Sequence, residues 1–141
     1  MLVHPRELPA ARTLVRGLPD VRFVIDHVAK PDIAHREVEP WASRLRLFAD
    51  LPNAWVKVSG MIEEADWQAW RPDDIQPYLD RVLDWFGPGR LVFGSNWPVC
   101  LVAGSYAQVY DVLSEALGAL SGPERALVFG GNATEAYARA L

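Results

Sequence analysis

The fold of this chain is decided by residues 90–100, which read RLVFGSNWPVC. The apolar run predicts a buried strand, the Gly-Ser pair predicts a turn, and Pro98 stops the strand. The turn delivers the polar side chain of Asn96 to the carboxyl end of the strand, where α/β proteins keep their chemistry. Residues 23–31, FVIDHVAKP, have the same form and deliver His27. Two buried strands that end in polar groups predict a functional edge.

Strand and helix patterns alternate along the whole chain. Short, largely β-branched runs predict strands at about 21–26, 54–59 and 90–94. Apolar residues at helical spacing predict helices over residues 8–18, 41–51, 75–86 and 106–120.

The order of these elements predicts a parallel sheet with helices packed outside it. Parallel strands point the same way, so His27, Ser59 and Asn96 should lie at the same end of the sheet. Two short helices are expected near the carboxyl terminus, opened by Ser121 and by Asn132, each with a Glu three residues later.

The composition fits one globular domain over residues 1–141. The net charge is −4 and no basic run is present, which argues against nucleic-acid binding. No apolar run reaches the roughly 18 residues of a membrane span, and no signal-peptide pattern opens the sequence, so no membrane contact is expected. Cys100 is the only cysteine, which excludes an intrachain disulfide and favours the cytoplasm.

Four motifs in order carry a resemblance to a known family: VIDH at 24–27 with the following Lys30, WVKVSG at 55–60, the segment 86–98, and GNA at 131–133. The chain resembles the carboxyl-terminal part of the amidohydrolase-related (amidohydrolase 2) family, on the branch with sugar-acid and pyrone-dicarboxylate lactonases. The resemblance implies an α/β fold, namely a partial (β/α)8 TIM barrel with strands six, seven and eight. Residues 1–4 would end strand five, and the first four strands, with their His-x-His motif, have no counterpart in this sequence.

The resemblance also implies a function, which is hydrolysis of a lactone or related cyclic ester or amide by activated water. The substrate would be a small lactone or sugar-acid derivative. Because a barrel closes its sheet, we expect self-association or a complementing amino-terminal half, and no activity from the isolated chain. Two alternatives remain open at this point: a non-catalytic remnant or subunit fragment, and a small open α/β sheet in place of the partial barrel.

Several residues are candidates for the site that the resemblance implies. His27 and Asn96 take the catalytic positions, with His27 contacting the substrate carbonyl or a metal. The family commonly has aspartate where Asn96 stands, and an amide cannot act as a base near neutral pH. The candidate substrate-binding residues are Lys57, Ser59 and Trp97.

The remaining candidates are less specific. Asp26 and Glu64 are the next candidates for the base, and His4 matches a metal ligand of some relatives. The resemblance leaves open whether a divalent metal such as zinc is bound or none. Trp67 and Trp70 are expected to pack rather than to bind a ligand, and Cys100 has no cationic neighbour that would make it a nucleophile.

Overall fold

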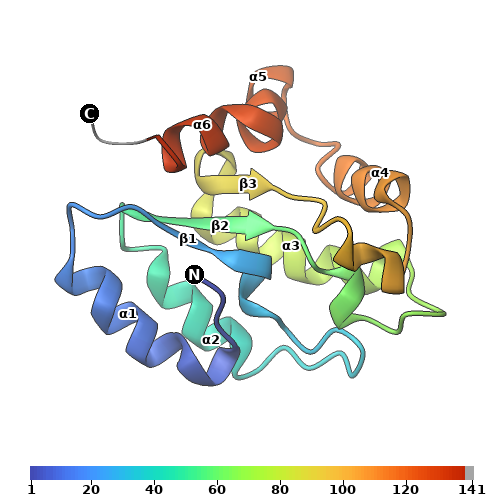
Figure 1. Cartoon of the computed structure of the whole chain (residues 1–141), viewed down its shortest axis with the longest axis horizontal. Coiled ribbons are helices and arrows are strands. Elements are labelled where there is room, and N and C mark those ends of the chain that lie inside the picture. The colour runs from blue at the N-terminus through green and yellow to red at the C-terminus, as the bar shows by residue number, and fades with distance from the viewer. Residues whose placement is uncertain (139–141) are drawn as a thin grey trace.

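Three parallel strands form the only sheet in residues 1–138, the part of the chain that the computed structural model describes. The strands are β1 (Phe23–Ile25), β2 (Ala54–Val58) and β3 (Leu91–Phe93), in the order β1-β2-β3 (Figure 1). Ile25 lies beside Val56, and Val58 lies beside Phe93. The three predicted strands and their common direction are confirmed, although each is shorter than its apolar run.

Helices lie before, between and after the strands, as the α/β prediction requires. They are α1 (Leu8–Gly17), α2 (Trp41–Leu45), α3 (Pro72–Phe86), α4 (Tyr106–Ala116), α5 (Gly122–Ala126) and α6 (Asn132–Ala136). The helix predicted over 41–51 is shorter, because α2 tightens into the 3-10 helix Arg46–Phe48. No helix in residues 1–138 has the length and apolar character needed to cross a membrane.

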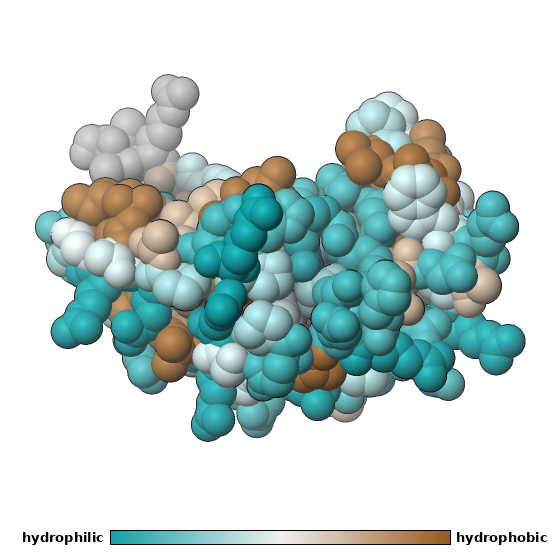
Figure 2. All heavy atoms as spheres, turned by 90° about the horizontal axis from the view of Figure 1, so that it is seen from below, coloured by the Kyte–Doolittle hydropathy of each residue, from teal (hydrophilic) through white to brown (hydrophobic). Residues whose placement is uncertain are grey.

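The main core lies between one face of the sheet and the helices. Ile25, Val56 and Leu91 are fully buried there. Side chains from four helices complete this core: Leu8, Val15, Trp41, Leu45, Ile75, Leu79, Val82 and Leu113. The surface in Figure 2 is mostly hydrophilic, with hydrophobic side chains gathered mainly along its upper margin.

The other face of the sheet carries a smaller apolar cluster and the polar side chains of the site. Val24, Trp55 and Val92 pack together with Ala136 of α6. Lys57 and Ser59 follow Trp55 at alternate positions, so they share its face. This face therefore changes from apolar to polar towards the carboxyl ends of the strands.

Residues 1–4 are not a strand, but Met1 lies beside β1 as a strand neighbour would. The Met1 nitrogen donates to the Val24 carbonyl, and the Asp26 N–H donates to the Met1 carbonyl at 2.9 Å. These two hydrogen bonds flank Ile25 in the pattern of a parallel pair. The start of the chain is thus placed on the far side of β1 from β2.

The two predicted helix starts near the carboxyl terminus have different outcomes. Ser121 is a cap, since its N–H and Oγ both bond Glu124, at 2.8 and 2.6 Å. The predicted last helix is present, since α6 begins at Asn132, but Asn132 does not cap it, because α5 continues through the π-helical turn Leu127–Gly131 into α6. Asn132 is buried, and its Nδ2 donates to the carbonyls of Pro88 and Leu91, at 2.7 and 2.8 Å. Its side-chain amide thus bonds the segment that leads into β3 instead of capping the helix.

We expect Asn132→Ala to lower the free energy of unfolding by about 2 kcal/mol, because carbonyls left without a donor cost about 1–3 kcal/mol. Urea denaturation followed by circular dichroism would measure the change. Thr134→Ala is the matched control, since Thr134 lies exposed on the same helix and should change stability by less than about 0.5 kcal/mol. Equal stabilities of the two variants would contradict the role of Asn132.

Candidate functional site

The ends of the three strands bring the predicted site residues to one edge of the sheet. His27 follows β1, Ser59 follows β2 and Asn96 follows β3. His27 Nδ1 lies 2.8 Å from Ser59 Oγ, and Ser59 is fully buried. The edge predicted from the strand pattern is therefore present, with His27 and Ser59 in direct contact.

The chain after β1 turns in the left-handed region to present His27. The φ angles of the four residues His27 to Lys30 lie between 46° and 59°. Left-handed backbone costs about 1–2 kcal/mol for each non-glycine residue, and such strain persists only where the surroundings hold it. Val28 and Ala29 are fully buried, and Trp41 Nε1 donates to the Val28 carbonyl at 2.6 Å. The core thus anchors the turn that positions His27.

Gly60 leaves the space that the His27 ring occupies. Its φ is 64°, and a Cβ on Gly60 would lie 2.7 Å from His27 Nδ1. Any larger residue at this position would displace the imidazole or the backbone. The Ser-Gly pair after β2 therefore supplies both the hydrogen-bond partner and the room for His27.

The surroundings of His27 disfavour its charged form. Burial lowers the pKa of the imidazole, and the positive charges of Lys57 and Lys30 lower it further, against the opposing effect of Asp26 and Glu64. The contact of Nδ1 with the Ser59 hydroxyl fixes the orientation of the ring, and the roles of donor and acceptor depend on the tautomer. In the tautomer in which Ser59 donates to Nδ1, the ring proton lies on Nε2, which makes Nε2 a hydrogen-bond donor.

Lys57 and Asp26 form an ion pair on the same face. The Lys57 Nζ lies 3.3 Å from Asp26 Oδ1, and both side chains are partly exposed. Gly94, directly after the neighbouring strand β3, makes room for the lysine stem, because a Cβ there would lie 2.8 Å from Lys57 Cε. The ammonium group therefore remains at the polar edge, paired with Asp26.

Asn96 is paired with a carboxylate that the sequence analysis did not single out. Asn96 Nδ2 donates to Glu63 Oε1 at 2.8 Å, and Glu63 lies on the 3-10 helix Ile62–Glu64. Burial raises the pKa of Glu63, while the bond from Asn96 opposes this shift. The neighbouring Glu64, which the sequence suggested, forms an ion pair with Lys30. The sequence does show two adjacent carboxylates after the second strand, Glu63 and Glu64. The 3-10 helix on which they lie decides which of them contacts Asn96.

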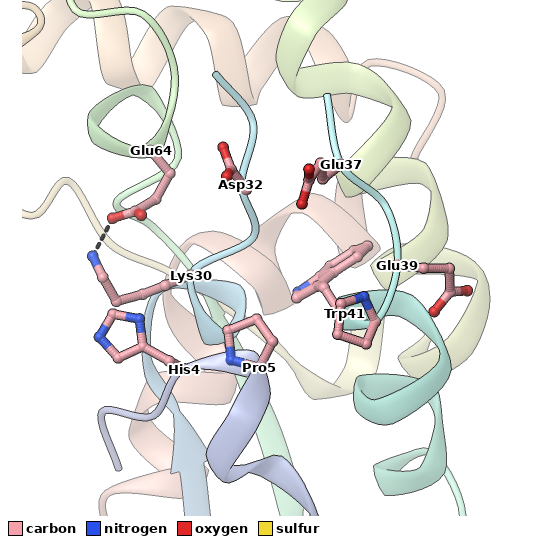
Figure 3. A pocket seen from close by; sticks show the side chains of 9 residues that line it. His4, Pro5, Lys30, Asp32, Glu37, Glu39, Trp41 and Glu64 are labelled. Atoms are coloured by element: carbon pink, nitrogen blue, oxygen red, sulfur yellow. Dashed lines mark hydrogen bonds and ion pairs between the residues drawn. The ribbon is translucent and has the colours of Figure 1, made fainter. Parts of the chain in front are cut away.

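A pocket adjoins this edge on the side of residues 4–5. It measures about 360 Å³, and Figure 3 shows Lys30 and Glu64 paired at one end of it, with His4 beside Lys30. Its remaining lining residues are Pro5, Asp32, Glu37, Glu39, Pro40 and Trp41. The carboxylate of Glu64, a candidate base from the sequence, is thus paired with the Lys30 ammonium group.

The aromatic candidates and the cysteine lie in different surroundings. Trp97 is 63% exposed after β3, where it is free to contact a ligand. Trp67 Nε1 donates to the Glu63 carbonyl and Trp70 Nε1 to the Ala103 carbonyl, each at 2.8 Å. Cys100 is fully buried, and burial raises the pKa of its thiol, which disfavours the nucleophilic thiolate.

A metal does not fit the described residues alone. Zinc sites take three or more protein ligands. Residues 1–138 contain no group of three or more His, Cys, Asp or Glu placed to hold a metal ion. His27 Nε2 and His4 are the imidazole groups nearest to this role, and neither has two further ligands beside it in that part of the chain.

Comparisons with known proteins connect this geometry to a family. The chain is 42% identical over 142 residues to an L-fucono-1,5-lactonase of Burkholderia ambifaria, covering 96% of this chain and 48% of that protein. It is 39% identical to an L-fucono-1,5-lactonase of Burkholderia multivorans, covering 98% and 50%. The chain thus spans about half the length of the curated relatives it matches.

A solved structure shows the same arrangement of elements. An amidohydrolase from Burkholderia multivorans with bound zinc superposes with a TM-score of 0.91 and 38% identity, covering 99% of this chain and 52% of that one. The prediction of a partial barrel is confirmed, and the open-sheet alternative is not needed. The sequence pattern of the Amidohydrolase family matches residues 1–139, and this chain therefore belongs to the amidohydrolase family.

Proposed function

We propose that this chain forms half of the active face of a lactone hydrolase that acts on small sugar-acid lactones. The observation that carries the proposal is the contact of His27 Nδ1 with Ser59 Oγ at the same strand edge as Asn96. The names of the two Burkholderia relatives support the substrate class. In this fold, chemistry belongs at the carboxyl ends of the strands, where these residues lie.

In the proposed reaction, water attacks the lactone carbonyl and the ring C–O bond breaks. The water oxygen becomes part of the new carboxyl group, and its proton ends on the released alkoxide. His27 Nε2–H donates to the carbonyl oxygen and stabilises the negative charge that develops there. In this proposal Ser59 acts through His27: its hydroxyl donates to Nδ1, 2.8 Å away, which favours the tautomer that donates from Nε2.

The other site residues have binding and orienting roles in this proposal. Asn96 accepts a hydrogen bond from the attacking water, and the base that takes the proton comes from the completing half. Lys57 attracts the negative charge of the substrate or product from its place beside Asp26. Trp97 offers an exposed aromatic face to the sugar ring.

The completing half would pair with the open side of β3. Within residues 1–138, β3 pairs with β2 alone, and a closed barrel has no free edge. Exposed apolar side chains follow directly after β3: Trp97, Val99, Leu101 and Val102. We propose that an amino-terminal half, or a second copy of this chain in its absence, covers this edge. The buried thiol of Cys100 fits a reducing compartment such as the cytoplasm.

We expect His27 to titrate below pH 6.5 and His35 above it. Burial and two lysines lower the pKa of His27, whereas the carboxylate of Asp32 raises the pKa of the exposed His35. Because the folded-state pKa of His27 lies below its unfolded value, its neutral form adds stability above about pH 6.5. That stability is lost as the pH falls towards the folded-state pKa. Two-dimensional NMR of the imidazole nitrogens measures both groups, and the reverse order would contradict the assignment.

We expect activity only when the chain is combined with the unmatched half of the Burkholderia ambifaria lactonase. In that mixture, His27→Ala should lower kcat about 10²–10³-fold, the usual cost of removing one hydrogen-bond donor that stabilises an oxyanion. His35→Ala is the matched control and should leave kcat unchanged. The assay is hydrolysis of a panel of sugar-acid lactones. Turnover by the chain alone would contradict the incomplete site, and equal activity of both variants would remove His27 from the chemistry.

We expect the purified chain to self-associate through the residues after β3. Contiguous exposed apolar surface drives such pairing. Leu101→Glu should shift the chain towards monomer in light scattering after size exclusion. Leu14→Glu on α1 is the matched control, because Leu14 is similarly exposed but lies on a helix away from β3. A monomeric starting chain, or an equal effect of both changes, would contradict this interface.

A further inference from the structure

Glu63 and Asn96 form a pair whose two partners come from different strand ends. Glu63 follows β2 and Asn96 follows β3, and the Nδ2–Oε1 distance is 2.8 Å. The second carboxylate oxygen, Oε2, is buried and has no hydrogen-bond partner within residues 1–138. The bond from Asn96 is therefore the main polar contact of this partly buried carboxylate.

The backbones of both residues are fixed independently of the pair. The Glu63 carbonyl accepts from Trp67 Nε1 at 2.8 Å, and the Asn96 carbonyl accepts from the Cys100 N–H at 3.1 Å. Asn96 has a φ of 55°, in the left-handed region that asparagine enters more readily than most residues. These backbone hydrogen bonds bring the side chains of Glu63 and Asn96 together. The hydrogen bond between the side chains then sets the orientation of the Asn96 amide group.

The chemistry of the two groups fixes the direction of that amide. An ionised carboxylate only accepts hydrogen bonds, whereas an amide has a donor end and an acceptor end. Glu63 therefore holds the Nδ2 end of Asn96 and leaves Oδ1 facing away from the carboxylate. An amide turned the other way would place two oxygens against each other.

We propose that Glu63 is the positioning residue for Asn96, and that its presence makes asparagine rather than aspartate the residue this site needs at position 96. The proposal rests on the proposed function, in which Asn96 Oδ1 accepts a hydrogen bond from the attacking water. Glu63 keeps Oδ1 available for that water and carries the negative charge behind it.

The same pair decides the effect of Asn96→Asp, the substitution that restores the residue common in the family. Asn96→Asp places two carboxyl groups at hydrogen-bond distance, and such a pair shares one proton because both cannot ionise together. The new carboxyl is then not a free base at neutral pH. The charged and titratable groups around the pair are Glu64 and Lys30 beside Glu63, and the buried thiol of Cys100.

NMR of the chain alone tests the pair without any need for activity. The Asn96 side-chain amide signals should move as Glu63 titrates, and this movement should vanish in Glu63→Gln. Glu64→Gln is the matched control, because it breaks the pair with Lys30 and should leave the Asn96 titration in place. Absence of a Glu63-dependent movement in the unmodified chain would overturn the proposal.

The aspartate variant gives the second readout. In Asn96→Asp, the carboxyl carbon signals should show an upper apparent pKa more than about one unit above the ordinary 3.9 of aspartate. Adding Glu63→Gln should return it to the ordinary range, because the glutamine carries no charge. Ordinary carboxyl pKa values in the single variant would overturn the proposal.

Kinetics of the complemented enzyme separate this inference from the proposed function. Asn96→Asp alone should lower kcat, and Asn96→Asp with Glu63→Gln should exceed it by about tenfold or more, the equivalent of one pKa unit. A rise in kcat from Asn96→Asp alone would overturn the positioning role. If no variant hydrolyses any lactone, the proposed function fails, while the NMR result still decides whether Glu63 positions Asn96.

Discussion

The contact between Gly60 and the His27 ring is the constraint on which the rest of the site depends. The imidazole lies against a position where a Cβ would come within 2.7 Å, and it bonds the buried hydroxyl of Ser59 next to it. This contact requires two neighbouring parallel strands to end at the same level. It also requires the left-handed turn after β1, which the buried Val28 and Ala29 hold in place. The energy of the hydrophobic core thus maintains a strained backbone that presents a neutral imidazole.

A second pairing of the same kind joins β2 to β3. Asn96 and Glu63 meet across the ends of these strands, as His27 and Ser59 meet across β1 and β2. In each pair, one side chain contacts a partner that follows the neighbouring strand. Lys57 and Asp26 form a further pair across the ends of β1 and β2. The edge is therefore a set of paired polar groups.

The sequence was sufficient for the strands and for the edge, because short β-branched runs followed by Gly or Pro are local signals. It did not indicate which of Glu63 and Glu64 meets Asn96, since a 3-10 turn of a few residues decides between them. It also misplaced Asn132, whose cap-like pattern is local, whereas its actual partners lie at the start of β3, about forty residues earlier in the chain. Long-range hydrogen bonds of single polar side chains leave no periodic pattern to read.

We propose that the carboxyl ends of β1, β2 and β3 form one half of an enclosed site. The most direct test is a crystal structure of the chain together with the unmatched half of the Burkholderia ambifaria lactonase. The account predicts that a strand of that half pairs with the open side of β3, and that His27 Nε2 and Asn96 Oδ1 face one shared cavity. A structure in which β3 keeps a free edge, or in which these two atoms face different sides of the barrel wall, would contradict it.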